Sequence, residues 1–323
     1  MTVLVTGALG AIGSRVVRTL VEHGHRPVAL DTRSDDELLR DIWSDFDFEV
    51  GDVRDWVTIG RVIREHGISE IVHMVAVLPD QAQLDPKLAT EVNVGGTLVI
   101  CELARAFGVR RVVFSSSKGV YRQVNDEHGH PTYVPLNEDY PIGPDGVYDV
   151  TKYAAEQLGL NYARSHGVDF VALRFAATYG PGRMARHGAL AIRSSIIENA
   201  FFGKPTILEQ GGDQLDDFVY TKDIAQALVK AIWAENLEHR IFNIGTGQAS
   251  SLAAASDILR RRFPEATIEI GSGTGYGATG RYCIFDISRA RRELGYEPEF
   301  DHQRGIDDYI TQLERRTHRP IDE

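Results

Sequence analysis

The sequence predicts an α/β protein built on a doubly wound parallel sheet, with a smaller C-terminal domain. Short apolar, β-rich runs alternate with amphipathic helical stretches up to residue 175, which is typical of a parallel sheet with helices on both faces. After residue 175 this alternation gives way to loops and shorter helices. We therefore expect a sheet domain formed by residues 1–175, to which residues 219–245 return, and a substrate-binding cap formed by residues 176–218 and 246–323.

The chain begins with a strand, a glycine-rich turn and a helix. Thr2–Val5 is the apolar strand, and Ser14–His23 carries apolar residues three or four positions apart. Between them, Gly7 allows a sharp turn, Gly10 lets the backbone approach a pyrophosphate, and Gly13 lets the helix pack closely on the sheet. The start of the helix also offers free N–H groups to an anion. This order predicts a dinucleotide site of the Rossmann type.

The next strand, Pro27–Leu30, ends at Asp31. A carboxylate at this position accepts hydrogen bonds from the ribose hydroxyls of an adenosine. It also repels the additional phosphate of NADP, so NAD is the expected cofactor. Arg33 is the counter-argument, because a guanidinium can pair with that phosphate. We interpret Arg33 as a solvated loop residue and keep NAD.

Two more strands and a helix follow. Phe46–Val50 and Glu70–Ala76 are predicted strands, and Trp56–His66 is a predicted helix. Asp52 follows the first of these strands, where its carboxylate can reach the adenine, cap the helix, or do both. His73 is interpreted as a packed strand residue, and the small residues at the end of its strand suit a close approach of the cofactor.

A long helix is predicted over Asp85–Phe107, with Pro86 tolerated near its start. Glycines inside a helix cost stability, so the pair Gly95-Gly96 should be explained by a close approach to another element. The strand Val109–Phe114 then runs into a row of serines, and Val147–His166 and Asp169–Phe175 are the next helix and strand.

The intervening segment Lys118–Gly146 is polar and rich in proline, so we expect a surface excursion beside the active site. Its His128 and His130 lack a third ligand at a suitable spacing, so no metal is expected.

The C-terminal part combines a return to the sheet with shorter helices. Thr221–Ala234 and Arg240–Ile244 are expected to rejoin the sheet domain. Gly271–Gly280 is interpreted as a flexible lid or connector. The expected helices of the cap are Leu190–Phe202, Leu252–Arg262, Ala290–Leu294 and Ile306–Arg315.

Composition and charge exclude several classes of function. The 323 residues carry a formal net charge of −11 and no long basic run, which argues against nucleic acid and anionic membranes as partners. The two cysteines, Cys101 and Cys283, lie far apart, which fits a reducing compartment. No N-terminal targeting segment and no bilayer-spanning run is evident. We expect a cytoplasmic protein.

The catalytic hypothesis rests on Tyr148 and Lys152, which lie four residues apart and therefore on one helical face. A phenol with a pKa of about 10 is a poor base at neutral pH. A nearby ammonium and a positively charged nicotinamide ring favour the phenolate, which can then act as a general base. Lys152 can also hold ribose hydroxyls. Ser117, which follows a strand, can hydrogen-bond the reacting oxygen.

These motifs resemble the extended short-chain dehydrogenase/reductase superfamily, and most closely its NAD-dependent epimerase/dehydratase branch, which includes sugar epimerases. The matching segments are Thr6-Gly7-x-x-Gly10-x-x-Gly13, Asn93-Val94-x-Gly96-Thr97, Ser115-Ser116-Ser117, Tyr148-x-x-x-Lys152, Arg174-Phe175-x-x-x-Tyr179-Gly180-Pro181, Asp217-Phe218-Val219-Tyr220-x-x-Asp223 and Phe242-Asn243-Ile244-Gly245. The resemblance implies tightly held NAD, a cleft between two domains, and Ser117, Tyr148 and Lys152 as the catalytic set. It also implies a homodimer formed through the helices Asp85–Phe107 and Val147–His166.

Together, the residues and the resemblance give a set of candidate site positions. The expected cofactor-binding residues are Gly7, Gly10, Ala11, Ile12, Gly13, Asp31, Arg33, Asp52, Val53, Val75, Ala76, Asn93, Ser115, Tyr148 and Lys152. The expected substrate-binding residues are Leu78, Ser117, Lys118, Ala177, Arg183, Arg186 and His187. The last three of these can bind a carboxylate or hydroxyls, or can be solvated loop residues.

The chain departs from the family pattern where relatives hold a nucleotide diphosphate. Nucleotide-sugar members usually have asparagine where this chain has Ala177, and arginine where it has Asp216. An aspartate in place of an arginine repels a diphosphate. A later arginine motif is also missing, and Arg281 is only a displaced candidate for it. These departures from the family pattern argue against a diphosphate-binding pocket in this chain.

The leading functional hypothesis is an NAD-dependent dehydrogenase that acts on a secondary alcohol of a small polyhydroxylated or sugar-like molecule. The alternative is a sugar or nucleotide-sugar epimerase, which oxidises its substrate transiently and regenerates NAD. A third hypothesis is a non-catalytic NAD-binding protein, against which the intact serine, tyrosine and lysine set argues.

Overall fold

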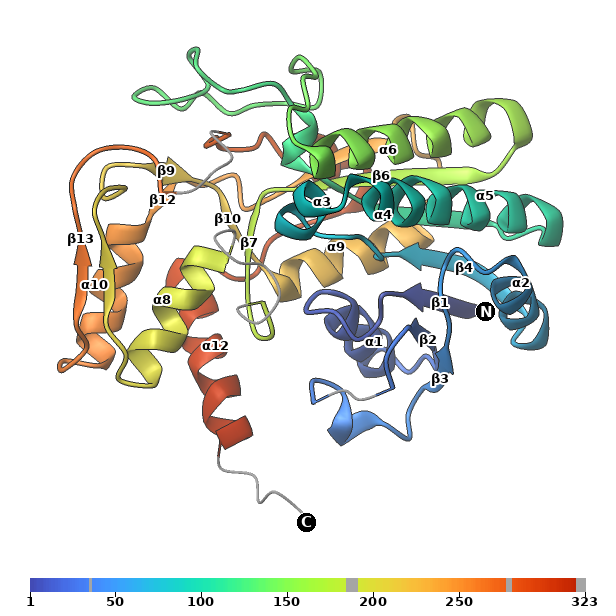
Figure 1. Cartoon of the computed structure of the whole chain (residues 1–323), viewed down its shortest axis with the longest axis horizontal. Helices are drawn as coiled ribbons and strands as arrows, with labels where there is room; N and C mark the ends of the chain where they lie inside the picture. The colour runs from blue at the N-terminus through green and yellow to red at the C-terminus, as the bar shows by residue number, and fades with distance from the viewer. Residues whose placement is uncertain (35–36, 184–190, 277–280, 318–323) are drawn as a thin grey trace.

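A seven-stranded parallel sheet lies between two layers of helices, and a second group of shorter elements extends from one end of it (Figure 1). The computed structural model describes residues 1–34, 37–183, 191–276 and 281–317. The strand order is β11-β6-β5-β4-β1-β2-β3, and every pairing in this sheet is parallel. These strands are β1 (Thr2–Thr6), β2 (Val28–Asp31), β3 (Asp47–Val50), β4 (Ile68–His73), β5 (Arg111–Ser117), β6 (Asp169–Phe175) and β11 (Ile241–Ile244). The predicted doubly wound α/β fold is confirmed.

Both faces of the sheet are apolar because successive side chains of a strand point to opposite sides. Leu4 of β1 and Val112 of β5 join one buried core, whereas Val5 and Val113 join the other. The first core is covered by α2 (Trp56–Glu65), α5 (Gly96–Phe107) and α6 (Val147–His166). The second is covered by α1 (Gly13–Glu22), α9 (Thr221–Trp233) and α11 (Ser288–Leu294). The assignment of Ala290–Leu294 to the cap is therefore wrong, because this helix buries Ala290 and Leu294 against the sheet.

The strand order reverses at β1, which pairs with β2 on one side and with β4 on the other. The connection after β1 leads to β2 on one side, whereas the connection after β4 leads to β5 on the other side. In open parallel sheets, this reversal creates a crevice at the carboxyl ends of the strands. The fold thus places the turn after β1, the loop after β4 and the end of β5 around one opening.

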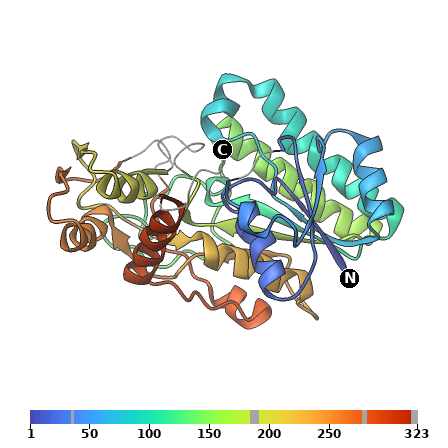
Figure 2. The same ribbon diagram turned by 90° about the horizontal axis from the view of Figure 1, so that it is seen from below.

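The cap has its own buried core, which lies beside the sheet in both views (Figures 1 and 2). Ile196, Leu259 and Ile310 from three helices meet in this core. Three two-stranded pairs complete it, namely β7 with β10, β8 with β13 and β9 with β12. The elements are β7 (Ala177–Tyr179), α8 (Ile192–Phe201), β8 (Thr206–Leu208), β9 (Leu215–Asp216), β10 (Phe218–Tyr220), β12 (Ser250–Ser251), α10 (Leu252–Arg262), β13 (Ile268–Ile270) and α12 (His302–Thr317).

The predicted helix over Asp85–Phe107 is present but is not regular. It runs without a break through α4 (Pro86–Ala89), the π-helical segment η2 (Thr90–Gly95) and α5, and a separate short helix, α3 (Pro79–Leu84), precedes it. A π-helical insertion shifts the side chains that follow it around the helix axis. The expected reason for an internal glycine holds at Gly96, where a Cβ would lie 2.7 Å from Val53 Cγ2.

The segment Lys118–Gly146 is not purely a surface excursion. It forms the green loops above α6 in Figure 1, begins with the short helix η3 (Lys118–Val120), and buries Tyr121, Leu136 and Tyr140 in the core of the sheet. Leu136 N donates to Ile284 O, so the segment joins a C-terminal part of the chain. Isolated aromatic and aliphatic residues between prolines carry no periodic pattern, which is why the sequence did not show this burial.

None of the helices in the described parts of the chain has the length and apolarity needed to cross a membrane. A short 3₁₀ turn, η1 (Arg40–Ile42), precedes β3.

Gly159 and Gly60 offer a matched test of the packing between helices and sheet. A Cβ on Gly159, in α6, would lie 2.1 Å from the Phe170 ring, whereas a Cβ on Gly60, in α2, would find its nearest neighbours at 3.7 Å. We expect Gly159→Ala to lower the free energy of unfolding by about 1–3 kcal/mol through overpacking. Gly60→Ala should raise it by about 0.5–1 kcal/mol through helix propensity. Urea titrations measure both, and equal effects would contradict the packing.

Candidate active site

A cavity of about 480 Å³ crosses the carboxyl edge of the sheet and continues to the cap. One end is bordered by the turn after β1 and by Asp31, and the other by Asp216, Phe218 and Tyr276. Ser117, Tyr148 and Lys152 line the stretch between them. The cavity therefore joins a nucleotide-like end to an end made by the cap.

The turn after β1 has the close backbone packing that the glycine pattern predicts. Gly7 has a φ of +69°, and a Cβ on Gly13 would lie 2.1 Å from Gly7 O. Among the described residues, no side chain caps the N-terminus of α1, and Ile12 and Gly13 at this helix start line the cavity. A helix start of this kind binds phosphate. The donors and the absence of Cβ atoms fit the pyrophosphate of NAD.

Asp31 ends β2 and lines the same end of the cavity. Its Oδ2 accepts a hydrogen bond from Leu9 N at 3.0 Å, which ties the strand end to the glycine turn. Arg33 lies beside it, with 3.7 Å between Arg33 Nε and Asp31 Oδ1. The nearest cation to Asp31 is therefore already paired with it, which leaves NAD the better match than NADP.

The predicted cofactor residues come together with one exception. Fourteen of them line the cavity, namely Gly7, Gly10, Ala11, Ile12, Gly13, Asp31, Arg33, Asp52, Val53, Val75, Ala76, Ser115, Tyr148 and Lys152. Asn93 does not line it. Its amide is buried, bonded to both backbone polar groups of Val77 and to Thr151 Oγ1 at 2.9 Å. Asn93 therefore fixes the loop after β4 against α6, behind the cavity wall.

Asp52 and His73 show which of their proposed roles the structure supports. Asp52 lines the cavity and pairs with Arg54, while Asp55 supplies the N-cap of α2 by accepting from Val57 N and Thr58 N. The capping role proposed for Asp52 is therefore wrong. His73 is buried between Thr6 and Thr97, and burial lowers its pKa to about 3. It is the packed strand residue that the sequence predicts.

Ser117 and Tyr148 form the polar centre of the cavity. Ser117 ends β5, and its Oγ accepts a hydrogen bond from Gly119 N at 3.0 Å, which turns the chain into η3. Tyr148 lies in the first turn of α6. Burial and the charge of Asp149 raise the pKa of Tyr148 to about 12, while the charge of Arg183 and a hydrogen bond with Ser117 oppose this shift. The phenol is therefore protonated at neutral pH in the protein alone.

Lys152 lines the same cavity as Tyr148, and its amine is buried. Its Nζ lies 4.1 Å from the centre of the Phe114 ring and 3.4 Å from Ser115 Oγ, and no effect of Lys152 on the Tyr148 pKa is resolved. Burial lowers the pKa of Lys152 to about 7, and the charge of Glu156 opposes this shift. Burial therefore dominates the pKa of Tyr148, and the expected effect of the Lys152 charge on it stays a prediction.

A buried ion pair between Glu156 and Arg174 holds α6, which carries Tyr148 and Lys152, against the sheet. Glu156 follows Lys152 by one helical turn and binds Arg174 of β6, with 2.6 Å between Glu156 Oε1 and Arg174 Nη2. Ser116 Oγ donates to the other carboxylate oxygen at 2.6 Å. All three side chains are buried. The pair therefore links α6 to β5 and β6 beneath the catalytic candidates.

The cap end of the cavity contains both predicted and unpredicted residues. Leu78, Ser117, Lys118, Ala177 and Arg183 line it as expected, while Arg186 and His187 lie outside the described residues. Four further lining residues were not among the predicted site residues, namely Asp149, Phe218, Tyr276 and Tyr282, and Asp216 and Arg281 were identified only as departures from the family pattern. Asp149 was detectable as the neighbour of Tyr148 and Phe218 as part of the motif Asp217-Phe218-Val219-Tyr220, but no motif marks Tyr276 or Tyr282.

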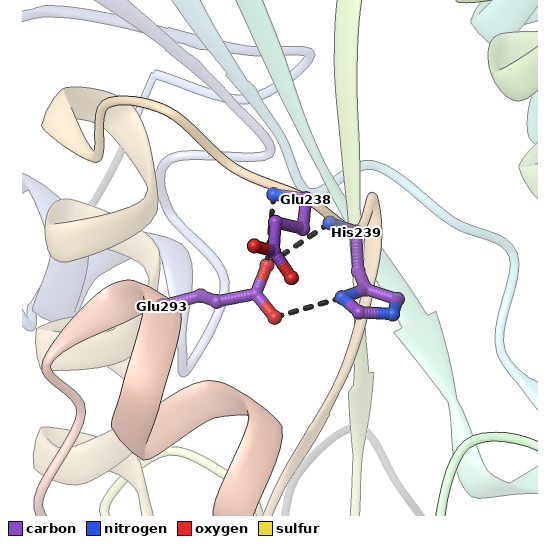
Figure 3. Close-up of side chains that lie close together, drawn as sticks. All are labelled: Glu238, His239 and Glu293. Carbon is purple, nitrogen blue, oxygen red and sulfur yellow. Dashed lines mark hydrogen bonds and ion pairs between the residues drawn. The ribbon is translucent and has the colours of Figure 1, made fainter.

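Among the described residues, Glu238, His239 and Glu293 form one group with the composition of a metal site (Figure 3). Glu293 Oε2 accepts from the backbone N of Glu238 and of His239, and Oε1 lies 2.7 Å from His239 Nδ1. The carboxylate thus closes the turn before β11. That turn lies at the amino end of a parallel strand, whereas the cavity lies at the carboxyl ends. We interpret the group as structural.

Comparison with known proteins gives one consistent result. The sequence profile described as "NAD dependent epimerase/dehydratase family" matches residues 3–245. A protein of Methanocaldococcus jannaschii named putative UDP-glucose 4-epimerase is 30% identical over 305 residues, which cover 94% of this chain and 95% of that protein.

Two solved structures show the same likeness. The UDP-glucose 4-epimerase of Thermotoga maritima with UDP-glucose is 25% identical, with a TM-score of 0.85 over 98% of this chain and 100% of that one. The UDP-glucose 4-epimerase of Thermus thermophilus in complex with NAD is 26% identical, with a TM-score of 0.82 over 97% of this chain and 99% of that one.

The lowered pKa of Lys152 predicts a pH effect on stability. Between pH 7 and the ordinary lysine value of 10.5, the unfolded chain binds a proton at this position that the folded chain does not bind. The free energy of unfolding therefore gains a contribution that rises with pH, by at most about 1.4 kcal/mol per pH unit. Urea titrations without cofactor should show the stability of the wild type rising relative to Lys152→Met between pH 7.5 and 9.5. Lys204→Met, at an exposed position, is the control. A difference independent of pH would contradict the burial of a titrating amine.

Proposed function

The chain belongs to the NAD-dependent epimerase/dehydratase family, and from this premise we propose that it oxidises a secondary alcohol of a small polyhydroxylated or sugar-like substrate. The observation that carries the proposal is the position of Ser117 and Tyr148. They line the cavity between the end that fits a dinucleotide and the end formed by the cap. A substrate bound at the cap end would therefore contact Ser117 and Tyr148 close to the nicotinamide end of a bound cofactor.

In the proposed reaction, the carbinol oxygen binds between Ser117 Oγ and Tyr148 Oη. Ser117 holds this oxygen as its charge changes, and Tyr148 receives its proton. When bound, NAD supplies the hydride acceptor and a positively charged ring, which opposes the effect of burial on the Tyr148 pKa. Lys152 lies one helical turn after Tyr148 on α6 and lines the same cavity, so it would hold the ribose hydroxyls of the cofactor. The same residues can return the proton in the reverse direction.

A second candidate function is sugar epimerisation. The named relatives favour it, because the protein that is 30% identical is called a putative UDP-glucose 4-epimerase. The side chains around the reacting carbon would act in the same way, but the ketone would be reduced again on its other face. The two candidates differ in one measurable product, since only the dehydrogenase releases NADH in each turnover.

The proposed function also implies a setting for the protein. We place it in the cytoplasm, which agrees with the two free and buried cysteines.

We also propose a homodimer through α5 and α6, which pack side by side and carry the partly exposed Leu98 and Val150. Light scattering should give twice the chain mass of 35.9 kDa. Leu98→Glu with Val150→Glu should give monomers, and a wild-type monomer would refute the interface.

The experiment that tests the function follows NADH absorbance while free sugars, sugar acids and nucleotide sugars are offered with NAD. We expect NADH to accumulate with at least one unphosphorylated compound. Interconversion of sugars without NADH would support the epimerase instead.

Tyr148→Phe should lower kcat by about 10²–10⁴-fold, because the proton acceptor is lost while the ring still packs. Its affinity for NAD, measured by titration calorimetry, should stay close to that of the wild type. Ser117→Ala should lower kcat less, by losing one hydrogen bond to the reacting oxygen. Full turnover by Tyr148→Phe would instead indicate a protein whose NAD binding serves another purpose.

A further inference from the structure

An ion pair between Lys118 and Asp216 borders the cap end of the cavity. Lys118 directly follows Ser117, and Asp216 ends β9 of the cap. Lys118 Nζ lies 2.6 Å from Asp216 Oδ2 and 2.9 Å from Oδ1, so both oxygens contact the same ammonium. The Asp216 side chain is 2% exposed and that of Lys118 is 12% exposed. The pair is therefore nearly removed from solvent except on the side of the cavity.

Asp216 has no acceptor capacity left for a ligand. Its Oδ1 also accepts from the backbone N of Asp217 and of Cys283, at 3.0 and 3.3 Å. Its Oδ2 also accepts from Tyr276 Oη at 3.1 Å. A carboxylate with two oxygens provides about four acceptor sites, and this one accepts five hydrogen bonds from four donor groups. The carboxylate therefore acts on a ligand only through its charge and through the groups that it holds.

Lys118 keeps one donor. An ammonium has three N–H groups, and two of them suffice for the two oxygens of Asp216. Within the described ranges, no third acceptor contacts Lys118 Nζ, and the side chain lines the cavity. The rings of Tyr276 and Tyr282 lie 4.8 Å apart on the same wall, and Lys118 Nζ lies 6.0 Å from the Tyr282 ring. This wall offers aromatic faces and a single N–H donor.

The other cations near this end have different surroundings. Arg281 binds Tyr121 O, Asp145 and Asp149. The Arg193 guanidinium lies over the rings of Tyr179 and Phe218, at 4.9 and 4.4 Å, and does not line the cavity. Arg183 lines the cavity, and its charge interacts with Tyr148. Lys118 is thus the lining cation in direct contact with Asp216, and its charge is already neutralised.

We propose that Asp216 neutralises Lys118 so that this end of the cavity accepts the hydroxyl groups of an unphosphorylated polyol or sugar and rejects phosphate groups. The inference rests on the proposed function, since it assumes that the substrate enters this end. A hydroxyl oxygen can take the remaining N–H of Lys118 without bringing a charge close to Asp216. A phosphate would gain little from a cation in direct contact with a carboxylate, and it would face the charge of that carboxylate in a poorly solvated place.

The test compares the affinities of UDP and uridine, which differ by the diphosphate, in calorimetric titrations of the protein saturated with NAD. We expect the wild type to bind UDP no more tightly than uridine. Asp216→Asn keeps the shape and leaves the ammonium without a counter-charge, so UDP should gain at least about tenfold over uridine. The double variant Lys118→Met with Asp216→Asn should remove that gain in UDP affinity, because the gain depends on the charge of the Lys118 ammonium.

Asp308→Asn is the matched control, because Asp308 pairs with Lys222 at the same 2.6 Å but away from the cavity, and it should leave the ratio of the affinities unchanged. A wild type that binds UDP tenfold or more tightly than uridine overturns the proposal, even if the variants do not fold. A ratio that Asp216→Asn leaves unchanged, in protein that still binds NAD, overturns it as well. Because these titrations need no turnover, a failure to form NADH from any polyol would count against the proposed function alone.

Discussion

The arrangement of the site depends on the buried ion pair between Glu156 and Arg174. Arg174 gives its guanidinium to Glu156 through two nitrogens, and it also donates to Glu138 O and covers the Tyr121 ring. One side chain of β6 thus holds α6 and the segment after η3 together. Breaking one partner of such a pair leaves an uncompensated buried charge, which typically costs 3–5 kcal/mol. The position of α6 relative to the sheet, and hence that of Tyr148 and Lys152, follows from this contact.

Backbone atoms form one end of the cavity, and side chains form the other. At the dinucleotide end, backbone groups and missing Cβ atoms shape the surface, as the contact of Gly13 with Gly7 O shows. At the cap end, charged and aromatic side chains shape it, with Asp216 and Tyr276 coming from elements far apart in the chain. Backbone features of this kind recur wherever a pyrophosphate is bound. Side chains can be replaced one at a time, which suits the end that must distinguish substrates.

The sequence predicted the sheet and its helices well because their patterns are periodic and local. The bounds of α6 and β6 agree with the prediction to the residue. It failed at η2, where a π-helical insertion breaks the period without any change in composition. It also failed for Tyr121 and Leu136, whose burial depends on a partner segment more than a hundred residues away. Local pattern carries no information about such partners.

The candidate site shows the same division. The glycine turn, Asp31 and the pair Tyr148 and Lys152 are local motifs, and the structure brings them to one cavity. The protonation state of Tyr148 was not accessible in this way, because it depends on how completely the folded chain excludes water from the phenol. Asn93 was assigned to the cofactor from its motif, yet its amide joins a loop to a helix.

Ser117 and Lys118 share one peptide bond, with the turn of η3 beginning between them. A movement of the backbone that re-aims the lysine must therefore re-aim the serine, so that turnover and selectivity are mechanically coupled at this corner. Asp216 reaches the same ammonium from the cap without sharing any backbone with Ser117. Substitutions intended to change the substrate preference should therefore be made in β9. There they can change the ligand preference while Ser117 keeps its hydrogen bond to the reacting oxygen.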